Sequence, residues 1–160
     1  MKYFVTSDLH FNHDKIIDYC ERPFKHIDEM NTALIDNWNS VVNWNDTVFH
    51  IGDFSFGNSQ HYINRLNGKI IFIKGNHDDV NLTRIENLHF NYGGLDIFMA
   101  HDPALAFISP VKHMICGHVH NLFKELNQKK STKHIINAGT DVWNYTPVNI
   151  DSIIKLFNKK

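Results

Sequence analysis

Short apolar runs alternate along the chain with longer segments in which apolar residues recur every three or four positions. The short runs have the length of buried strands. They predict strands over 2–6, 47–51, 69–74, 95–100, 113–116 and 134–138. The run KIIFIK at 69–74 is almost continuously apolar, which is typical of a strand covered on both faces.

The periodic segments predict helices. Over 27–42, apolar residues share one face of an amphipathic helix, for which Asp28 is the expected N-cap. A second helix is predicted over 58–66, and a third over 151–159, where a strand followed by a tail is the alternative. The polar segment 121–133 is expected to form a hairpin or a loop.

This order of elements predicts an α/β fold. Strands and helices alternate in the first half of the chain, whereas the later strands have few helices between them. Two packed sheets are therefore expected. The 160 residues suit a single domain over 1–160 that buries a sizeable core.

Composition and charge narrow the class of partner. The formal net charge of −1 disfavours an extended footprint on long DNA or RNA. Two cysteines make no disulfide framework, and no signal peptide or run near the ~18 apolar residues of a membrane span is recognised. A cytoplasmic protein without a membrane partner is expected, and its oligomeric state is not legible from the sequence.

The most informative side chains follow the predicted strands. Five strands are each followed within a few residues by Asp, Asn or His, and five of the twelve histidines lie at these junctions. The junctions read SDLH at 7–10, GD at 52–53, GNHD at 75–78, HD at 101–102 and GHVH at 117–120. One such residue is ordinarily a turn residue or a cap. Because ligands bind at the carboxyl ends of strands in open α/β sheets, five such junctions predict a metal site.

With D-x-H, G-D, G-N-H-D, H and G-H-x-H in this order, residues 3–120 resemble the calcineurin-like metallophosphoesterase superfamily. The segments TSDLHFNH and GTDVWNYTP are similar to small, single-domain bacterial and phage members. The resemblance implies a four-layer α/β/β/α sandwich of two mixed sheets and two divalent metal ions. One ion would be held by Asp8, His10, Asp53 and His120, and the other by Asp53, Asn76, His101 and His118, with Asp53 bridging.

The ligand types narrow the choice of metal. Carboxylate, amide and imidazole together suit Mn²⁺, Fe, Zn²⁺ or Ni²⁺ better than Ca²⁺, and the lack of thiolate argues against a structural zinc site. Mn²⁺ is the expected ion. A hydroxide bridging the two ions would attack phosphorus directly, so no covalent protein nucleophile is expected. The expected substrate is a small phosphorylated molecule, either a phosphodiester or a small nucleotide.

By resemblance, His77 would lie beside the ions and protonate the leaving group or stabilise the phosphoryl group. A turn histidine bonded to backbone is the alternative, and Asp78 is expected to stabilise the turn or support the ligands. Phosphoprotein phosphatases of the family read G-D-x-x-D-R-G, whereas this chain reads GDFSFG at 52–57. The Asp that orients the histidine and the Arg that binds phosphate are therefore missing, and Asp14 becomes a candidate orienting residue.

Two further residues are candidates for substrate binding. His13 is expected at the start of a short helix within NHDKIIDYC, where it would touch the substrate phosphate or simply be exposed. Arg22 would be another phosphate contact or a surface arginine. Trp143 and Tyr145 would pack in the core or form a base-stacking wall.

The alternatives to a phosphodiesterase are a nuclease or phosphomonoesterase of the same superfamily and a catalytically silent scaffold, as the metallophosphoesterase-like subunit of retromer illustrates. Silent members usually lose ligands, particularly the GNH histidine. The complete ligand set and His77 therefore favour a metal-dependent phosphoesterase.

Overall fold

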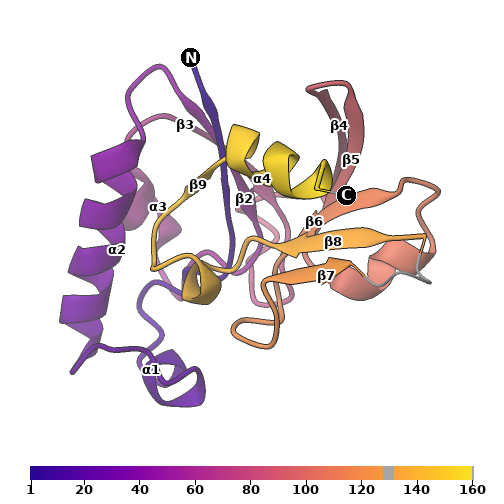
Figure 1. Ribbon diagram of the computed structural model, residues 1–160. Coiled ribbons are helices and arrows are strands. Elements are labelled where there is room, and N and C mark those ends of the chain that lie inside the picture. Colours follow the sequence, from indigo (N-terminus) through magenta and orange to yellow (C-terminus); the bar gives the residue numbers. More distant parts are fainter. Residues whose placement is uncertain (128–131, 160) are drawn as a thin grey trace.

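A computed structural model describes residues 1–127 and 132–159. Its first sheet has the strand order β3-β2-β1-β9 (Figure 1). The strands β1 (Tyr3–Thr6), β2 (Thr47–Ile51) and β3 (Lys69–Ile73) are parallel. The short strand β9 (Val148–Asn149) pairs antiparallel with β1.

The second sheet has the order β4-β5-β6-β8-β7. Its central strands β5 (Leu95–Ala100), β6 (His113–Cys116) and β8 (His134–Asn137) are parallel. The edge strands β4 (Asn87–Tyr92) and β7 (Glu125–Asn127) are antiparallel to their neighbours. Both sheets are therefore mixed, as predicted.

Four α-helices and two 3₁₀ helices complete the described structure. The α-helices are α1 (Ile16–Tyr19), α2 (Ile27–Val41), α3 (Ser59–Ile63) and α4 (Ile150–Phe157). The 3₁₀ helices are η1 (Pro103–Phe107) and η2 (Thr140–Val142). The alternative of a strand at the end of the chain is excluded, because α4 is helical.

The core lies in three layers. Helix α2 buries Met30, Leu34 and Trp38 against the outer face of the first sheet (Figure 1). The two sheets pack face to face through strand residues such as Ile51 and Ile115, and α4 joins this middle core. The outer face of the second sheet is covered by η1. The predicted α/β/β/α layering is confirmed, although a single 3₁₀ helix forms most of the fourth layer.

Strand prediction succeeds where apolar runs are long. The bounds of β2, β5 and β6 are as predicted, and those of β1, β3 and β8 differ by one residue at one end. The N-cap prediction for α2 is wrong. His26 caps the helix by accepting the Glu29 N–H at Nδ1 (3.3 Å), so Asp28 lies inside the first turn.

Strands β4 and β9 were not predicted. Strand β4 alternates exposed and half-buried residues at a sheet edge, so it lacks a long apolar run. The turn between β4 and β5, Gly93-Gly94, has φ values of 59° and 77° and is a recognised hairpin signal. Strand β9 has two residues, too few for a periodic pattern.

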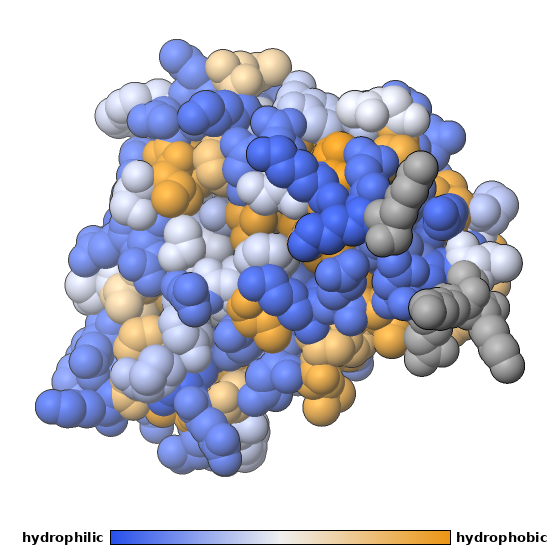
Figure 2. Space-filling view, in the orientation of Figure 1, coloured by the Kyte–Doolittle hydropathy of each residue, from blue (hydrophilic) through white to orange (hydrophobic). Residues whose placement is uncertain are grey.

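The predicted hairpin or loop at 121–133 is in part a hairpin, since β7 pairs antiparallel with β8; residues 128–131 lie outside the described residues. The face in Figure 2 is mostly hydrophilic, with its hydrophobic side chains in small separate groups. Among the described residues, no helix has the length and hydropathy needed to cross a membrane.

Candidate metal centre

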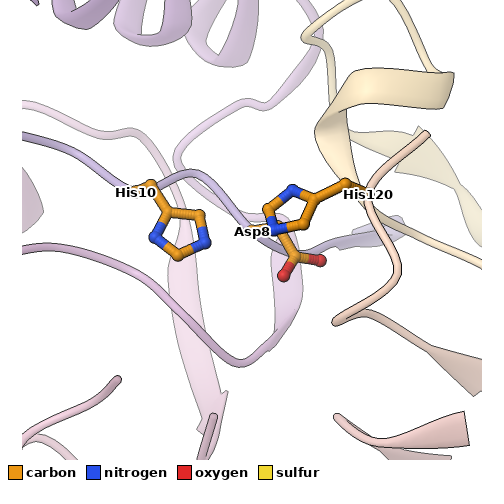
Figure 3. A group of neighbouring side chains, drawn as sticks. All are labelled: Asp8, His10 and His120. Carbon is orange, nitrogen blue, oxygen red and sulfur yellow. The ribbon is translucent and has the colours of Figure 1, made fainter. Parts of the chain in front are cut away.

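The carboxyl ends of β1, β2 and β3 lie at one edge of the first sheet, and those of β5 and β6 at one edge of the second. This arrangement brings two groups of predicted ligands together. The ligand atoms of Asp8, His10 and His120 lie within 4.8 Å of one another (Figure 3), as do those of Asp8, Asp53 and His101. Residues separated by more than 100 positions in sequence therefore converge on one point.

Asp53 belongs to the second group and also faces His10 of the first group. Its Oδ2 is 3.5 Å from His10 Nε2 and 3.3 Å from His101 Nε2. Its Oδ1 accepts the backbone N–H of His77 at 2.9 Å. One carboxylate thus faces a histidine of each predicted ligand set, which is the placement that a bridging ligand requires.

The remaining predicted ligands gather around the Asn76 amide. Its Oδ1 lies 3.1 Å from His101 Nε2 and 3.0 Å from His118 Nδ1. The backbone N–H of His118 in turn donates to the Asp8 carboxylate at 3.0–3.1 Å. All seven residues predicted as ligands therefore belong to one connected cluster.

Backbone strain is concentrated in this cluster. Five predicted ligands have left-handed backbone, with φ between 46° and 71°: Asp8, His10, Asp53, His118 and His120. This conformation costs a non-glycine residue about 1–2 kcal/mol, although Asp and His tolerate it better than most residues. Strain of this kind clusters at functional sites, where the surrounding fold over-determines it.

Two motif glycines are explained by close approach. A Cβ on Gly75 would overlap the Asp53 carboxylate, and a Cβ on Gly117 would overlap Ser7 Oγ and the Asp8 carboxylate. The glycines of GNHD and GHVH thus leave the space in which ligands from other strands lie.

The surroundings of His10 are suited to a metal ion. The side chain is 2% exposed, yet neither ring nitrogen has a hydrogen-bond partner. Burial lowers the pKa of His10 to about 3, against the opposing effect of Asp53, so the ring is neutral at physiological pH. A buried neutral imidazole with an unpartnered nitrogen facing two carboxylates is suited to coordinate a divalent cation.

Two other histidines favour their protonated forms when no ion neutralises the acids. Burial is the largest single effect on His101 and lowers its pKa, but the hydrogen bond to Asp53 and the negative charges of Asp8 and Asp53 together outweigh it and raise the pKa to about 9. At His120, burial is again the largest single effect and lowers the pKa, but the hydrogen bonds to Asp141 and Cys20 and the charge of Asp8 together raise it to about 10. Metal binding at these rings must therefore displace protons.

Asp141 was missed by the sequence prediction. Its Oδ2 accepts a hydrogen bond from His120 Nδ1 at 3.0 Å, which leaves Nε2 as the free ring nitrogen of His120. Burial raises the pKa of Asp141, but contacts with His120 and Arg22 outweigh it and keep the pKa below its usual range. A signal was present, because Asp141 follows a predicted strand just as the ligands do.

Arg22 was expected to be a phosphate contact or a surface arginine, and both expectations are wrong. It is 4% exposed, and its guanidinium forms a two-pronged ion pair with Asp141 at 2.8 and 3.1 Å. The same group donates to the backbone carbonyls of Asp8 (2.7 Å) and Leu9 (3.0 Å). Arg22 is therefore neither a surface residue nor open to a substrate phosphate, and it ties the first ligand loop to Asp141.

Two more buried residues hold the ligand loops in place. Asn137 is fully buried on β8 and donates from Nδ2 to the carbonyls of His120 and Phe123 at 2.7–2.8 Å. Asp78 accepts the backbone N–H groups of Asp53, Phe54 and Gly75, each at 2.8 Å. The predicted turn-stabilising role of Asp78 is confirmed, whereas Asn137 was not singled out.

His77 lies at the exposed rim of the cluster. The described contacts of its ring are with His10, at a centroid distance of 5.7 Å, and with Phe56 at 5.6 Å. Asp14 is exposed and is not among these contacts, so the structure gives no support to Asp14 as its orienting residue. The Phe56 ring occupies the position beside His77 instead.

His13 also lies at the rim, half-buried, with its ring stacked on Phe56 at 4.2 Å and 5.5 Å from His10. The expectation that it begins a helix is wrong. Helix α1 starts three residues later and has four residues, so no helix N-terminus supports an anion at His13. A contact between His13 and substrate remains a prediction.

Trp143 and Tyr145 are engaged within the protein rather than in a stacking wall. Trp143 Nε1 donates to the Asn137 carbonyl at 2.7 Å, and Lys124 lies over the ring at 3.6 Å. Tyr145 packs edge-on against Phe24.

A family model described as the calcineurin-like phosphoesterase superfamily domain matches residues 1–152. The chain belongs to this superfamily. Among its relatives is the uncharacterized protein MJ1445 of Methanocaldococcus jannaschii, which is 36% identical over 99% of this chain and 92% of the relative.

Solved structures share the calcineurin-like fold. A protein of unknown function from Aquifex aeolicus has a TM-score of 0.76 at 24% identity, covering 97% of this chain and 98% of that one. An archaeal phosphodiesterase has a TM-score of 0.50 at 22% identity, covering 87% and 84%. Vps29 of Entamoeba histolytica in complex with zinc has a TM-score of 0.51 at 20% identity, covering 87% and 74%. These likenesses show the fold, and the activity must be argued from the site.

Proposed function

We propose that this protein is a phosphoesterase that uses two divalent metal ions, with Mn²⁺ favoured, to hydrolyse a phosphodiester or a small nucleotide phosphate. The observation that carries the proposal is the Asp53 carboxylate, whose Oδ2 lies 3.5 Å from His10 Nε2 and 3.3 Å from His101 Nε2, one histidine of each proposed ligand set. An exposed histidine, His77, lies directly beside them.

Asp8, His10, Asp53 and His120 would hold one ion, and Asp53, Asn76, His101 and His118 the other. When bound, such a pair of ions polarises phosphoryl oxygens and makes water a competent nucleophile near neutral pH. The protein contributes the geometry, because Asp78, Arg22 and Asn137 hold the ligand loops through hydrogen bonds to their backbone.

His77 would donate a proton to the leaving-group oxygen. Its backbone N–H is fixed by Asp53, while its ring is free of hydrogen bonds to the described residues and open to solvent. General acids of this kind contribute about 10²- to 10⁴-fold to the rate. The missing G-D-x-x-D-R-G residues disfavour phosphoproteins, which leaves small esters as the favoured substrates.

The proposal is tested with bis(p-nitrophenyl) phosphate and the Mn²⁺-loaded protein. We expect hydrolysis by the wild type and a fall in kcat of about 10²- to 10⁴-fold in His77→Ala. Mn²⁺ stoichiometry should be unchanged in that variant, because His77 is not among the proposed ligands. His61→Ala, which removes an exposed histidine on α3, is the matched control.

A catalytically silent scaffold is the second candidate, since Vps29 shares the fold. A metal-loaded wild type that hydrolyses neither the diester nor p-nitrophenyl phosphate would favour the scaffold. Hydrolysis that is indifferent to His77→Ala would remove His77 from the mechanism while leaving the phosphoesterase in place.

A further inference from the structure

A cavity of about 560 Å³ opens directly beside the candidate metal centre. Its inner part is formed by the predicted site histidines, including His10, His77 and His120. Its outer part comes from segments far apart in sequence: helix α1, the loop after β2 and the loop after β6. A phosphate at the metal cluster would therefore have room for one of its ester groups in this space.

The outer wall is apolar and partly aromatic. Its apolar residues include Ile16, Tyr19, Phe56, Val119 and Leu122. Phe56 is held in place by its stacking on His13, with 13° between the ring planes. At the mouth, Tyr19 is 70% exposed and Leu122 is 79% exposed. Large apolar side chains in such positions leave apolar surface in water that a ligand can cover.

The same wall carries almost no charge. Of the described residues that line this cavity, none is Asp, Glu, Lys or Arg, and Asn121 is the only side-chain amide. On the other side of the centre, a cavity of about 370 Å³ is lined by Lys74, Glu86 and Asp102. The two sides of the candidate centre thus differ in chemistry, and the uncharged side suits an uncharged group.

We infer that the cavity between Tyr19, Phe56 and Leu122 is a subsite for the nucleobase of a nucleotide ester whose phosphate lies at the metal cluster. A planar, uncharged ring can stack on aromatic faces and cover the apolar mouth. The exposed amide of Asn121 is available to its polar edge. This inference rests on the proposed function and names its substrate class.

The test compares ligands that share a phosphate and differ in the attached group, by isothermal titration of the Mn²⁺-loaded protein. We expect AMP to bind about tenfold more tightly than ribose 5-phosphate, because only AMP brings a base. Phenyl phosphate should likewise bind more tightly than cyclohexyl phosphate, which has the same carbon count without a planar ring. Tyr19→Ala and Leu122→Ser should each reduce the preference for AMP several-fold.

Trp44→Ala is the matched control, since it removes another large side chain that is 83% exposed. Trp44 lies in the loop that leads into β2, at the end of the first sheet opposite the candidate metal centre. It should leave the preference unchanged. Equal binding of AMP and ribose 5-phosphate overturns the subsite, as does a preference that survives both Tyr19→Ala and Leu122→Ser. If cyclohexyl phosphate binds with the same affinity as phenyl phosphate, the assignment to a planar group is overturned.

The titration tests the subsite and the hydrolysis assay tests the proposed function, so the two can be overturned independently. A preference for AMP without hydrolysis of either the diester or p-nitrophenyl phosphate would support the subsite and defeat the proposed enzyme. Diester hydrolysis without a preference for AMP would support the enzyme and defeat the subsite.

Discussion

The deep and the rim residues of the candidate centre differ in how their positions are set. Asp8, His10, Asp53 and His101 are at most 5% exposed. Asn76, His77 and His118 are exposed to solvent. Buried neighbours such as Arg22 and Asp78 hold the backbone that carries the deep acids. Among the rim residues, the Asn76 and His118 side chains contact each other, and the backbone N–H groups of His77 and His118 donate to the deep acids.

This difference separates two tasks. A ligand that is fixed before an ion arrives loses little conformational freedom on binding, so the deep residues should set metal affinity. An exposed side chain that is not a proposed ligand can reach a substrate, so His77 should set turnover. His77→Ala tests the rim by lowering kcat without releasing metal, and the following variants test the deep region.

The largest effect is expected at Asp53, because it faces both ligand groups. Asp53→Asn keeps the shape of the side chain but removes the charge that two cations would share. We expect the metal content to fall from two ions per chain to one or none, and hydrolysis to fall at least about 10³-fold. Elemental analysis and the diester assay measure these effects. Asp36→Asn, on the exposed face of α2, is the control, and full metal content in Asp53→Asn would end the bridging assignment.

The next effect concerns His10 in the metal-free protein. Its pKa is about 3 when folded and near 6.5 when unfolded, so below pH 6.5 the unfolded state binds a proton that the folded state does not. The free energy of unfolding should therefore fall as the pH falls through this window. Relative to His10→Asn, the wild type should lose about 3 kcal/mol between pH 6.5 and pH 4.

Urea unfolding in EDTA at several pH values measures that difference. His61→Asn, which removes an exposed histidine, should follow the wild type. If His10→Asn also follows the wild type, the His10 ring takes up a proton in the folded protein and is not held neutral by burial.

The smallest effect is expected at Asp141, which touches a predicted ligand without being one. Asp141→Asn weakens the acceptor for His120 Nδ1 and removes the charge that pairs with Arg22. We expect Mn²⁺ affinity to fall about 10- to 100-fold by titration calorimetry, as for other supporting carboxylates. Asp141→Glu, which keeps the charge, should recover part of the loss. Wild-type affinity in Asp141→Asn would show that His120 is held by the backbone alone.

The local sequence predicted the buried ligands better than it predicted the buried residues, such as Arg22 and Asp141, that hold them in place. The five strand junctions stand out because each strand is an apolar run and each polar residue follows it directly. Arg22 resembles a surface arginine in the sequence, since nothing near it shows that Asp141 will lie at 2.8 Å. A contact across 119 positions depends on the packing of whole elements and leaves no local pattern.

The amino-acid sequence by itself determined the six strands with long apolar runs, the order of the helices, the family and the seven polar residues that follow those strands, because apolar periodicity and short motifs are local properties. Only the tertiary structure decided that five of these residues adopt left-handed backbone, that Arg22 is buried and that Tyr19 and Leu122 face one cavity. These features arise where distant segments meet. They are stabilised by contacts between residues that are not neighbours in the chain.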